Sequence, residues 1–153
     1  MGQSDLISGG ETVQTLLVVQ HDVLIRFQIC GYLRECGYRV IEAANSDEAL
    51  IVLQEPDLMV DIVLSDAAIA GRMDGFGLSQ WLRANRTGMP IILVGSPGRA
   101  VEAAADLCEA GPMLARPYEP EILLDRIKRT LAERPLPPGG AIGRPGAGII
   151  VYP

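Results

Sequence analysis

The fold of this chain is most constrained by a regular alternation between short apolar runs and longer stretches with helical periodicity. The apolar runs are rich in β-branched residues and are bounded by turn residues, which is typical of buried strands. They occupy residues 16–19, 38–42, 60–66, 90–94 and 113–115. Because strands that alternate with helices form parallel sheets joined by right-handed crossovers, we predict a three-layer α/β/α sandwich with a doubly wound parallel sheet of five strands.

Local patterns set the expected helix boundaries and buried faces. After the first strand, four apolar residues are spaced to share one helix face: Val23, Phe27, Cys30 and Leu33. Gly37 can adopt the left-handed conformation that ends this helix. Asn45 and Glu48 have the spacing of the N-cap and N3 residues of a second helix. The other helices are predicted at about residues 75–85, 99–110 and 120–133.

Composition and charge narrow the class of protein. The chain has 153 residues and an apolar fraction of 48%, which suits one domain with one hydrophobic core. Its net charge of −6 argues against nucleic-acid binding, which needs a basic surface, and against adhesion to anionic membranes. No apolar run approaches the roughly 18 residues that span a bilayer.

The two ends differ in composition from the rest of the chain. We expect residues 1–12 to be a flexible leader, residues 13–133 the folded domain and residues 134–153 an extended tail. Ten of the last twenty residues are proline or glycine, which disfavours a helix there. The amino terminus shows no basic region followed by an apolar stretch, so no secretion signal is expected.

The three cysteines are Cys30, Cys36 and Cys108. An odd number of cysteines without a secretion signal favours reduced thiols in a cytoplasmic protein. We expect them to be small buried side chains, because a zinc site needs more ligands and the chain has one histidine.

Asp66 is the strongest candidate for a reactive residue. It ends the apolar run at residues 60–66, so its carboxylate is predicted at the carboxyl end of a buried strand. Open α/β sheets place their ligands and chemistry at that edge.

Four features carry a resemblance to a known family. They are the turn Gln20-His21-Asp22 with Arg26 beyond it, Asp66 followed by Met73-Asp74-Gly75, the strand at residues 90–94, and Arg116-Pro117-Tyr118 after Ala110-Gly111. In this order and spacing, over about residues 15–133, the chain resembles the receiver domain of bacterial two-component response regulators. The resemblance implies the sheet order 2-1-3-4-5. It also implies that Asp66 is a phosphoacceptor, receiving a phosphoryl group from a phosphohistidine.

The positions that assist this chemistry in the family are changed here. Gln20 and His21 occupy the two acidic positions that help to hold Mg²⁺, and Gly95 stands where the family has Thr or Ser, with Ser96 next to it. Arg116 replaces the lysine that contacts the phosphoryl oxygens. The site has therefore lost two carboxylates, and with them the negative charge that recruits a hard dication. We expect no cofactor, with Mg²⁺ bound weakly or not at all.

These observations lead to one favoured function and two alternatives. The favoured one is a single-domain, atypical response regulator in a phosphorelay, with Asp66 as acceptor and output through protein contacts. Its expected partners are a histidine kinase or phosphotransfer protein and a downstream protein, and self-association into a homodimer stays open. The alternative is a pseudo-receiver that works as a scaffold without phosphorylation. A hydrolase using His21 and Asp66 is the third reading, and we do not expect an enzyme, because no oxyanion donors can be named.

Overall fold

The structure is a computed structural model that describes residues 13–110 and 120–132. The elements are β1 (Thr15–Val19), α2 (Val23–Glu35), β2 (Arg39–Ala43), α3 (Ser46–Leu53), β3 (Ile62–Asp66), α4 (Gly75–Asn85), β4 (Ile91–Val94), α5 (Pro97–Ala110) and α6 (Pro120–Ala132). From β1 to α5, strands and helices alternate along the chain, as predicted.

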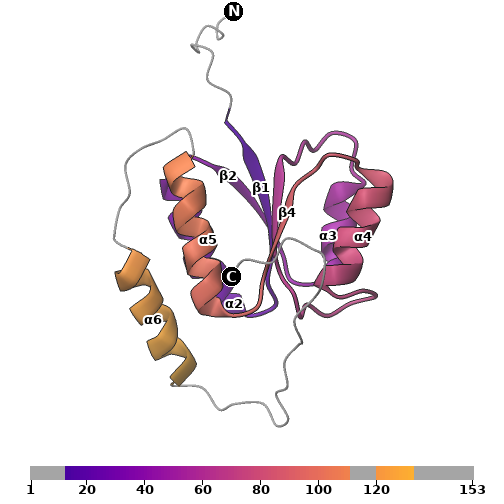
Figure 1. The fold of residues 1–153 in the computed structure, drawn as a ribbon. Coiled ribbons are helices and arrows are strands. Elements are labelled where there is room, and N and C mark those ends of the chain that lie inside the picture. The colour runs from indigo at the N-terminus through magenta and orange to yellow at the C-terminus, as the bar shows by residue number, and fades with distance from the viewer. Residues whose placement is uncertain (1–12, 111–119, 133–153) are drawn as a thin grey trace, which may run out of the picture.

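The four described strands form one parallel sheet in the order β2-β1-β3-β4. Helices α2 and α5 cover one face of this sheet, with α6 packed against them on the same side, and α3 and α4 cover the other face (Figure 1). The predicted doubly wound α/β/α sandwich is therefore confirmed, with the order 2-1-3-4. The fifth strand, predicted at residues 113–115, lies outside the described residues.

Two hydrophobic clusters lie on opposite faces of the sheet. Along β1 all five residues are buried, and alternate side chains enter opposite clusters because successive strand residues point to opposite faces. Leu16 and Val18 join the cluster beneath α2, α5 and α6, whereas Leu17 and Val19 join the cluster beneath α3 and α4. The continuous apolar run of β1 is thus explained by a strand covered on both sides.

The predicted buried face of α2 is only half right. Cys30 and Leu33 are fully buried, but Val23 and Phe27 are 61% and 69% exposed. The buried stripe of the helix runs through Ile29 instead. At 3.6 residues per turn, Phe27 lies about 160° around the helix from Ile29, so it faces away from the sheet.

The prediction of three reduced thiols is wrong for two of the cysteines. Cys36 and Cys108 form a disulfide with a Cα–Cα distance of 5.4 Å, and Cys30 is a free, buried thiol. Both members of the pair were expected to be buried, and they are. This pairing was not predicted from the sequence, because 72 residues separate the two cysteines. The packing of α2 against α5 brings them together.

The amino-terminal cap of α3 is confirmed. The Asn45 side chain accepts a hydrogen bond from the Glu48 amide at 2.9 Å, and the Glu48 carboxylate accepts one from the Ala44 amide at 2.7 Å. The first bond satisfies an amide that the helix start leaves without a partner, and the second attaches Glu48 to the residue before the cap. Within the described residues, no helix combines the length and apolar character needed to cross a membrane.

Candidate functional site

Sheet register brings three of the predicted site positions to one edge. Val19 of β1 is paired with Ser65 of β3, so the next residues along, Gln20 and Asp66, follow at the same level. On the other side of β3, Asp66 is paired with Val94, the last residue of β4, and Gly95 follows it. Parallel strands end at the same edge of a sheet. Asp66 therefore lies between the residues that follow β1 and those that follow β4.

The Asp66 carboxylate is half-buried, and one of its oxygens accepts a hydrogen bond from the backbone nearby. Its Oδ1 accepts a hydrogen bond from the Ala68 amide at 3.0 Å. The second oxygen forms no hydrogen bond with any described residue, and no described cation lies within ion-pair distance. Among the described residues, one carboxylate oxygen of Asp66 is therefore left without a partner.

The Met73-Asp74-Gly75 turn brings the start of α4 against Asp66. The Gly75 amide donates to the Ala67 carbonyl oxygen at 3.0 Å, and the Asp74 carboxylate caps α4 by accepting from the Gly77 amide at 2.9 Å. A Cβ on Gly75 would lie 2.7 Å from the Asp66 carbonyl oxygen, which is too close for any side chain. The glycine of this motif thus serves a close approach of backbones.

The rest of the loop after Asp66 is fastened to the start of α3. The Ser46 amide donates to the Ala70 carbonyl oxygen at 2.9 Å, and the Ser46 hydroxyl accepts from the Met73 amide at 3.1 Å. Between them Gly71 has φ = 111°, and a Cβ there would lie 2.3 Å from the Ser46 oxygen. An ion pair between Arg72 and Asp47 at 3.3 Å adds to these contacts.

Sequence reasoning did not find this attachment. Ser46 is completely buried, although serine at the start of an exposed helix is usually a surface residue. Gly71 was the available signal, since a glycine inside a loop next to a reactive residue often marks a left-handed conformation. Its partner Ser46 is 25 positions away, and no local pattern joins the two.

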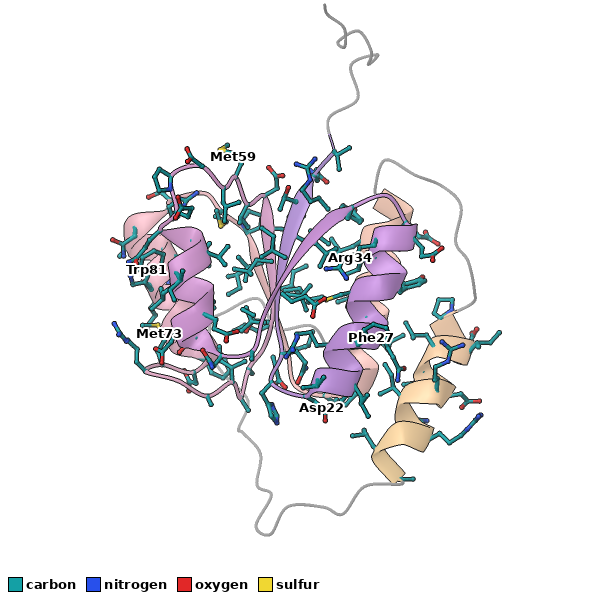
Figure 2. All side chains as sticks on the ribbon, turned by 180° about the vertical axis from the view of Figure 1, so that it is seen from behind. Asp22, Phe27, Arg34, Met59, Met73 and Trp81 are labelled. Atoms are coloured by element: carbon teal, nitrogen blue, oxygen red, sulfur yellow. A yellow bond between two sulfur atoms is a disulfide. The ribbon has the colours of Figure 1, made fainter. Side chains whose placement is uncertain are left out.

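The side chains of Gln20 and Asp22, which follow β1, form hydrogen bonds at the start of α2. Gln20 is 6% exposed, and its side-chain oxygen accepts from the Asp22 amide at 3.3 Å. Asp22 in turn caps α2, because its carboxylate accepts from the Leu24 and Ile25 amides at 3.0 and 3.1 Å. His21 is exposed between them. Figure 2 shows Asp22 at the same edge of the molecule as Met73, which belongs to the loop after Asp66.

Gly95 and Ser96 leave open space beside Asp66. Both are exposed, and a Cβ on Gly95 would meet no atom of the described residues within 4 Å. The Ser96 hydroxyl accepts from the Arg99 amide at 3.2 Å, so it caps α5. The last predicted site residue, Arg116, lies outside the described residues.

These side chains do not fit a magnesium site. Mg²⁺ takes oxygen ligands in near-octahedral geometry, usually one or two carboxylates together with water or phosphate oxygens. Asp66 is the one predicted site residue here with a carboxylate, Gln20 directs its oxygen to a backbone amide, and His21 offers nitrogen. Over residues 13–110 and 120–132, no three His, Cys, Asp or Glu side chains gather as metal ligands. Weak or absent Mg²⁺ binding stays a prediction.

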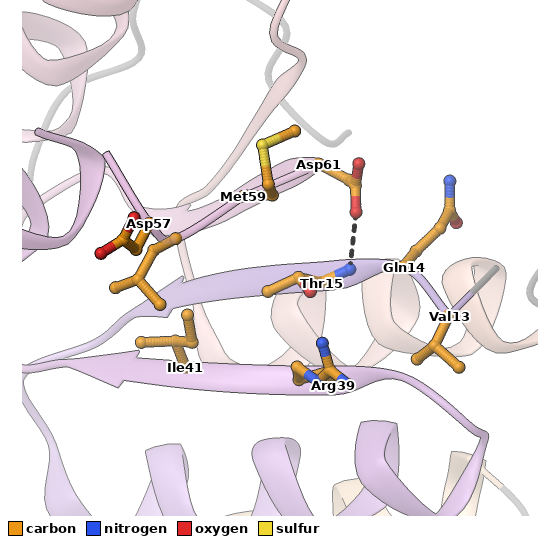
Figure 3. A pocket seen from close by; sticks show the side chains of 9 residues that line it. Val13, Gln14, Thr15, Arg39, Ile41, Asp57, Met59 and Asp61 are labelled. Atoms are coloured by element: carbon orange, nitrogen blue, oxygen red, sulfur yellow. Dashed lines mark hydrogen bonds between the residues drawn. The ribbon is translucent and has the colours of Figure 1, made fainter. Parts of the chain in front are cut away.

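A separate hollow of about 440 Å³ opens at the opposite, amino-terminal edge of the sheet (Figure 3). It lies where β1 and β2 begin and where the chain approaches β3, and the Thr15 amide donates to the Asp61 carboxylate there at 2.8 Å. Met59, at its rim, lies at the edge opposite Asp22 in Figure 2. Of the predicted site residues that the structure describes, none lines this hollow.

Comparison with known proteins agrees with this geometry. Residues 16–128 match the model of the response regulator receiver domain, so the chain belongs to the response regulator receiver family. Among solved structures, the chemotaxis response regulator CheY4 of Vibrio cholerae is 26% identical, with a TM-score of 0.51. The alignment covers 77% of this chain and 98% of that one. A CheY-like receiver domain protein from Methanospirillum hungatei is 27% identical, also with a TM-score of 0.51, over 80% and 96% of the two chains.

Curated relatives are longer proteins. The "Probable transcriptional regulator ycf27" of Pyropia yezoensis is 31% identical over 141 residues, which is 90% of this chain and 55% of the relative. The transcriptional regulatory protein AruR of Pseudomonas aeruginosa is 32% identical over 123 residues, or 78% of this chain and 50% of the relative. The chain thus spans about half the length of these relatives. Receiver domains are signalling modules of two-component systems and not classical enzymes.

Proposed function

We propose that Asp66 accepts a phosphoryl group and that the domain passes this signal on through protein contacts. The observation that carries the proposal is the position of the carboxylate. It ends the central strand β3 of a receiver fold, at the edge where parallel sheets place their chemistry, and one of its oxygens forms no hydrogen bond with a described residue.

The proposed step is a transfer between two side chains. A carboxylate oxygen of Asp66 attacks the phosphorus of a phosphohistidine on the donor protein, and an O–P bond forms as the N–P bond breaks. The imidazole leaves and takes a proton. Developing negative charge on the phosphoryl oxygens needs positive partners, and we assign that role to Arg116, with His21 contributing when it is protonated.

An exposed apolar surface supports a protein donor. Val23, Leu24 and Phe27 are 61%, 45% and 69% exposed and belong to the first turns of α2, which starts at the Asp66 edge. Three neighbouring apolar side chains on one exposed helix are typical of a protein contact site. We propose that a histidine kinase or phosphotransfer protein contacts this surface while its phosphohistidine reaches Asp66.

The proposed contacts are with proteins and not with nucleic acid. The named relatives are transcriptional regulators about twice as long as the matched region. The net charge of this chain is −6, and duplex DNA repels such a surface. We therefore assign the output of residues 13–132 to a downstream protein.

A second candidate is a scaffold that never carries phosphate. It is favoured by Gln20, whose side chain is bound to the Asp22 amide in place of a metal-binding carboxylate. In that function Asp66 would be a structural residue that closes the turn at Ala68. The two candidates differ in one measurable property, which is covalent phosphorylation.

The test is intact-mass measurement after incubation with a small phosphodonor such as acetyl phosphate or phosphoramidate. We expect a gain of one phosphoryl group that disappears in Asp66→Asn. Asp57→Asn is the matched control, because Asp57 is an exposed carboxylate at the opposite edge of the sheet. An unchanged mass for the native chain with every donor would leave the scaffold as the function.

A further inference from the structure

We propose that Cys36 and Cys108 form a reversible redox clamp that fixes α5 against α2. This inference extends the proposed function, because both helices begin at the Asp66 edge of the sheet. The observations that carry it are the position of the disulfide, the way each helix is held, and a second contact at the same place.

The disulfide joins the far ends of two helices that both start beside the acceptor. Helix α2 begins after Gln20 and His21, and Cys36 is its carboxyl-terminal cap. Helix α5 begins after Ser96, and Cys108 lies in its last turn. The bond therefore sits at the opposite end of α5 from the residues beside Asp66.

Helix α2 is firmly attached to the sheet. Arg26 and Arg34 both pair with the Glu42 carboxylate of β2, at 3.0 and 3.1 Å, and Arg34 also donates to the Val40 carbonyl oxygen at 3.0 Å. These contacts make α2 the fixed partner. The Cys36–Cys108 bond thus attaches α5 to α2, and α2 is itself attached to β2.

Helix α5 packs largely through small side chains. Half of the six buried apolar residues on this helix are alanines: Ala100, Ala103 and Ala104, with Val101, Leu107 and Cys108. Alanine removes little apolar surface from water compared with leucine, so this interface has less packing energy per residue. The disulfide therefore adds a covalent attachment to a helix whose packing depends largely on small side chains.

A second contact keeps the fold intact when the disulfide opens. The Tyr38 hydroxyl donates to the Leu107 carbonyl oxygen, next to Cys108. Both cysteines also belong to a continuous hydrophobic cluster formed by α2, α5, α6 and the sheet. The reduced protein therefore stays folded, with α5 attached by weaker contacts, and this gives two states of one fold.

The disulfide forms and breaks by exchange with small thiols and disulfides. When the clamp forms, the two thiols lose two electrons and two protons and an S–S bond is made. A low-molecular-weight disulfide accepts them, its own S–S bond breaks, and two small thiols are released. A small dithiol reverses the reaction. Both sulfurs are buried, so exchange requires the last turn of α5 to move outward briefly.

The test uses the full chain equilibrated with reduced and oxidised glutathione, followed by alkylation and peptide mass analysis. We expect the Cys36–Cys108 pair in the oxidised mixture and its loss with excess dithiothreitol under native conditions. Failure of the pair to form, or its persistence in the dithiol, overturns the proposal. Cys30→Ala is the matched control, because it keeps the pair and should behave as the native chain does.

Amide hydrogen exchange then tests the effect on α5. We expect exchange in the last turns of α5 to be at least tenfold slower in the oxidised protein than in the reduced protein. Cys36→Ala/Cys108→Ala should match the reduced protein under both conditions. Equal exchange rates in the two redox forms of the native chain overturn the clamp, and this comparison needs no variant.

Phosphoryl uptake separates this inference from the proposed function. If α5 adjusts around the phosphoryl group, the reduced protein takes up phosphate at least threefold faster than the oxidised protein. Equal uptake would remove the link to the site. If neither form takes up phosphate, the proposed function fails, while the exchange measurement still decides whether the clamp exists.

Discussion

Gly75 approaches Asp66 so closely that a Cβ on the glycine would lie 2.7 Å from the Asp66 carbonyl oxygen. Its amide also donates to the Ala67 carbonyl oxygen at 3.0 Å. The start of α4 and the end of β3 therefore form one tightly packed unit around the proposed acceptor. The glycine of the Met73-Asp74-Gly75 turn is required by this packing.

Gly75→Ala should destabilise the protein and disturb the acceptor. The added methyl group must displace backbone atoms of Asp66 and Ala67, and such overpacking costs about 1–3 kcal/mol. Urea unfolding measures the loss. Gly31→Ala is the control, since a Cβ there meets nothing within 4 Å, and alanine in a helix should add about 0.5–1 kcal/mol of stability. A neutral Gly75→Ala would show that the two elements are not packed as described.

Gly95→Thr should increase the rate of phosphoryl uptake. Gly95 has open space around its Cα and lies next to Asp66, so a hydroxyl there can donate to a phosphoryl oxygen. The expected gain is about 10-fold, near the effect of one hydrogen bond to a charged group. Gly95→Ala supplies the control, because it adds the Cβ without the hydroxyl. Equal rates for the threonine and alanine variants would rule out this role for the position.

The buried Cys30 thiol makes stability depend on pH in alkaline solution. Burial, together with the nearby Glu42 carboxylate, raises the pKa of Cys30 from 9.0 to about 12. The folded protein keeps this proton at a pH where the unfolded chain has lost it, so stability is full below pH 9 and falls as the pH rises toward 12. The slope from this group is at most about 1.4 kcal/mol per pH unit.

The measurement for Cys30 is the unfolding free energy of the native chain and of Cys30→Ala at several pH values from about 8 to about 11. Other groups titrate in both proteins, so the difference between the two curves isolates Cys30. We expect the native chain to lose stability more steeply. Parallel curves would mean that the Cys30 pKa is not raised by folding.

Restoring the acidic pair should create a metal site. Gln20→Asp/His21→Asp adds two carboxylates at the edge where Asp66 ends its strand, and carboxylate oxygens are the ligands that Mg²⁺ prefers. We expect at least tenfold tighter Mg²⁺ binding than in the native chain, measured by calorimetric titration. The same double change combined with Asp66→Ala is the control and should bind weakly. Tight Mg²⁺ binding by the native chain would contradict the charge argument.

The sequence predicted the fold well because the fold depends on local periodicity. Short apolar runs marked all four described strands, and the Asn45 and Glu48 spacing marked a real helix cap. It also placed Asp66 at the correct sheet edge, since a strand end is visible in the sequence. The error at Phe27 came from reading helical spacing without knowing which face meets the sheet.

The contacts that sequence reasoning missed all join distant residues. Ser46 lies against Gly71 and Cys36 bonds to Cys108 because the folded structure brings these residues together. A single sequence holds no local signal for such pairs, because periodicity describes one element at a time. The site was predicted as a set of strand ends, and the loop attachments that support it required the structure.

The central claim is that Asp66 takes up a phosphoryl group at a site that does not depend on a bound dication. The most direct test is the rate of uptake from phosphoramidate, followed by intact mass, in magnesium-containing buffer and in buffer with excess chelator. We expect phosphorylation in both buffers, with rates that agree within about twofold, because surface charges alone have weak effects. Uptake that appears only with magnesium, or that survives in Asp66→Asn, would contradict it.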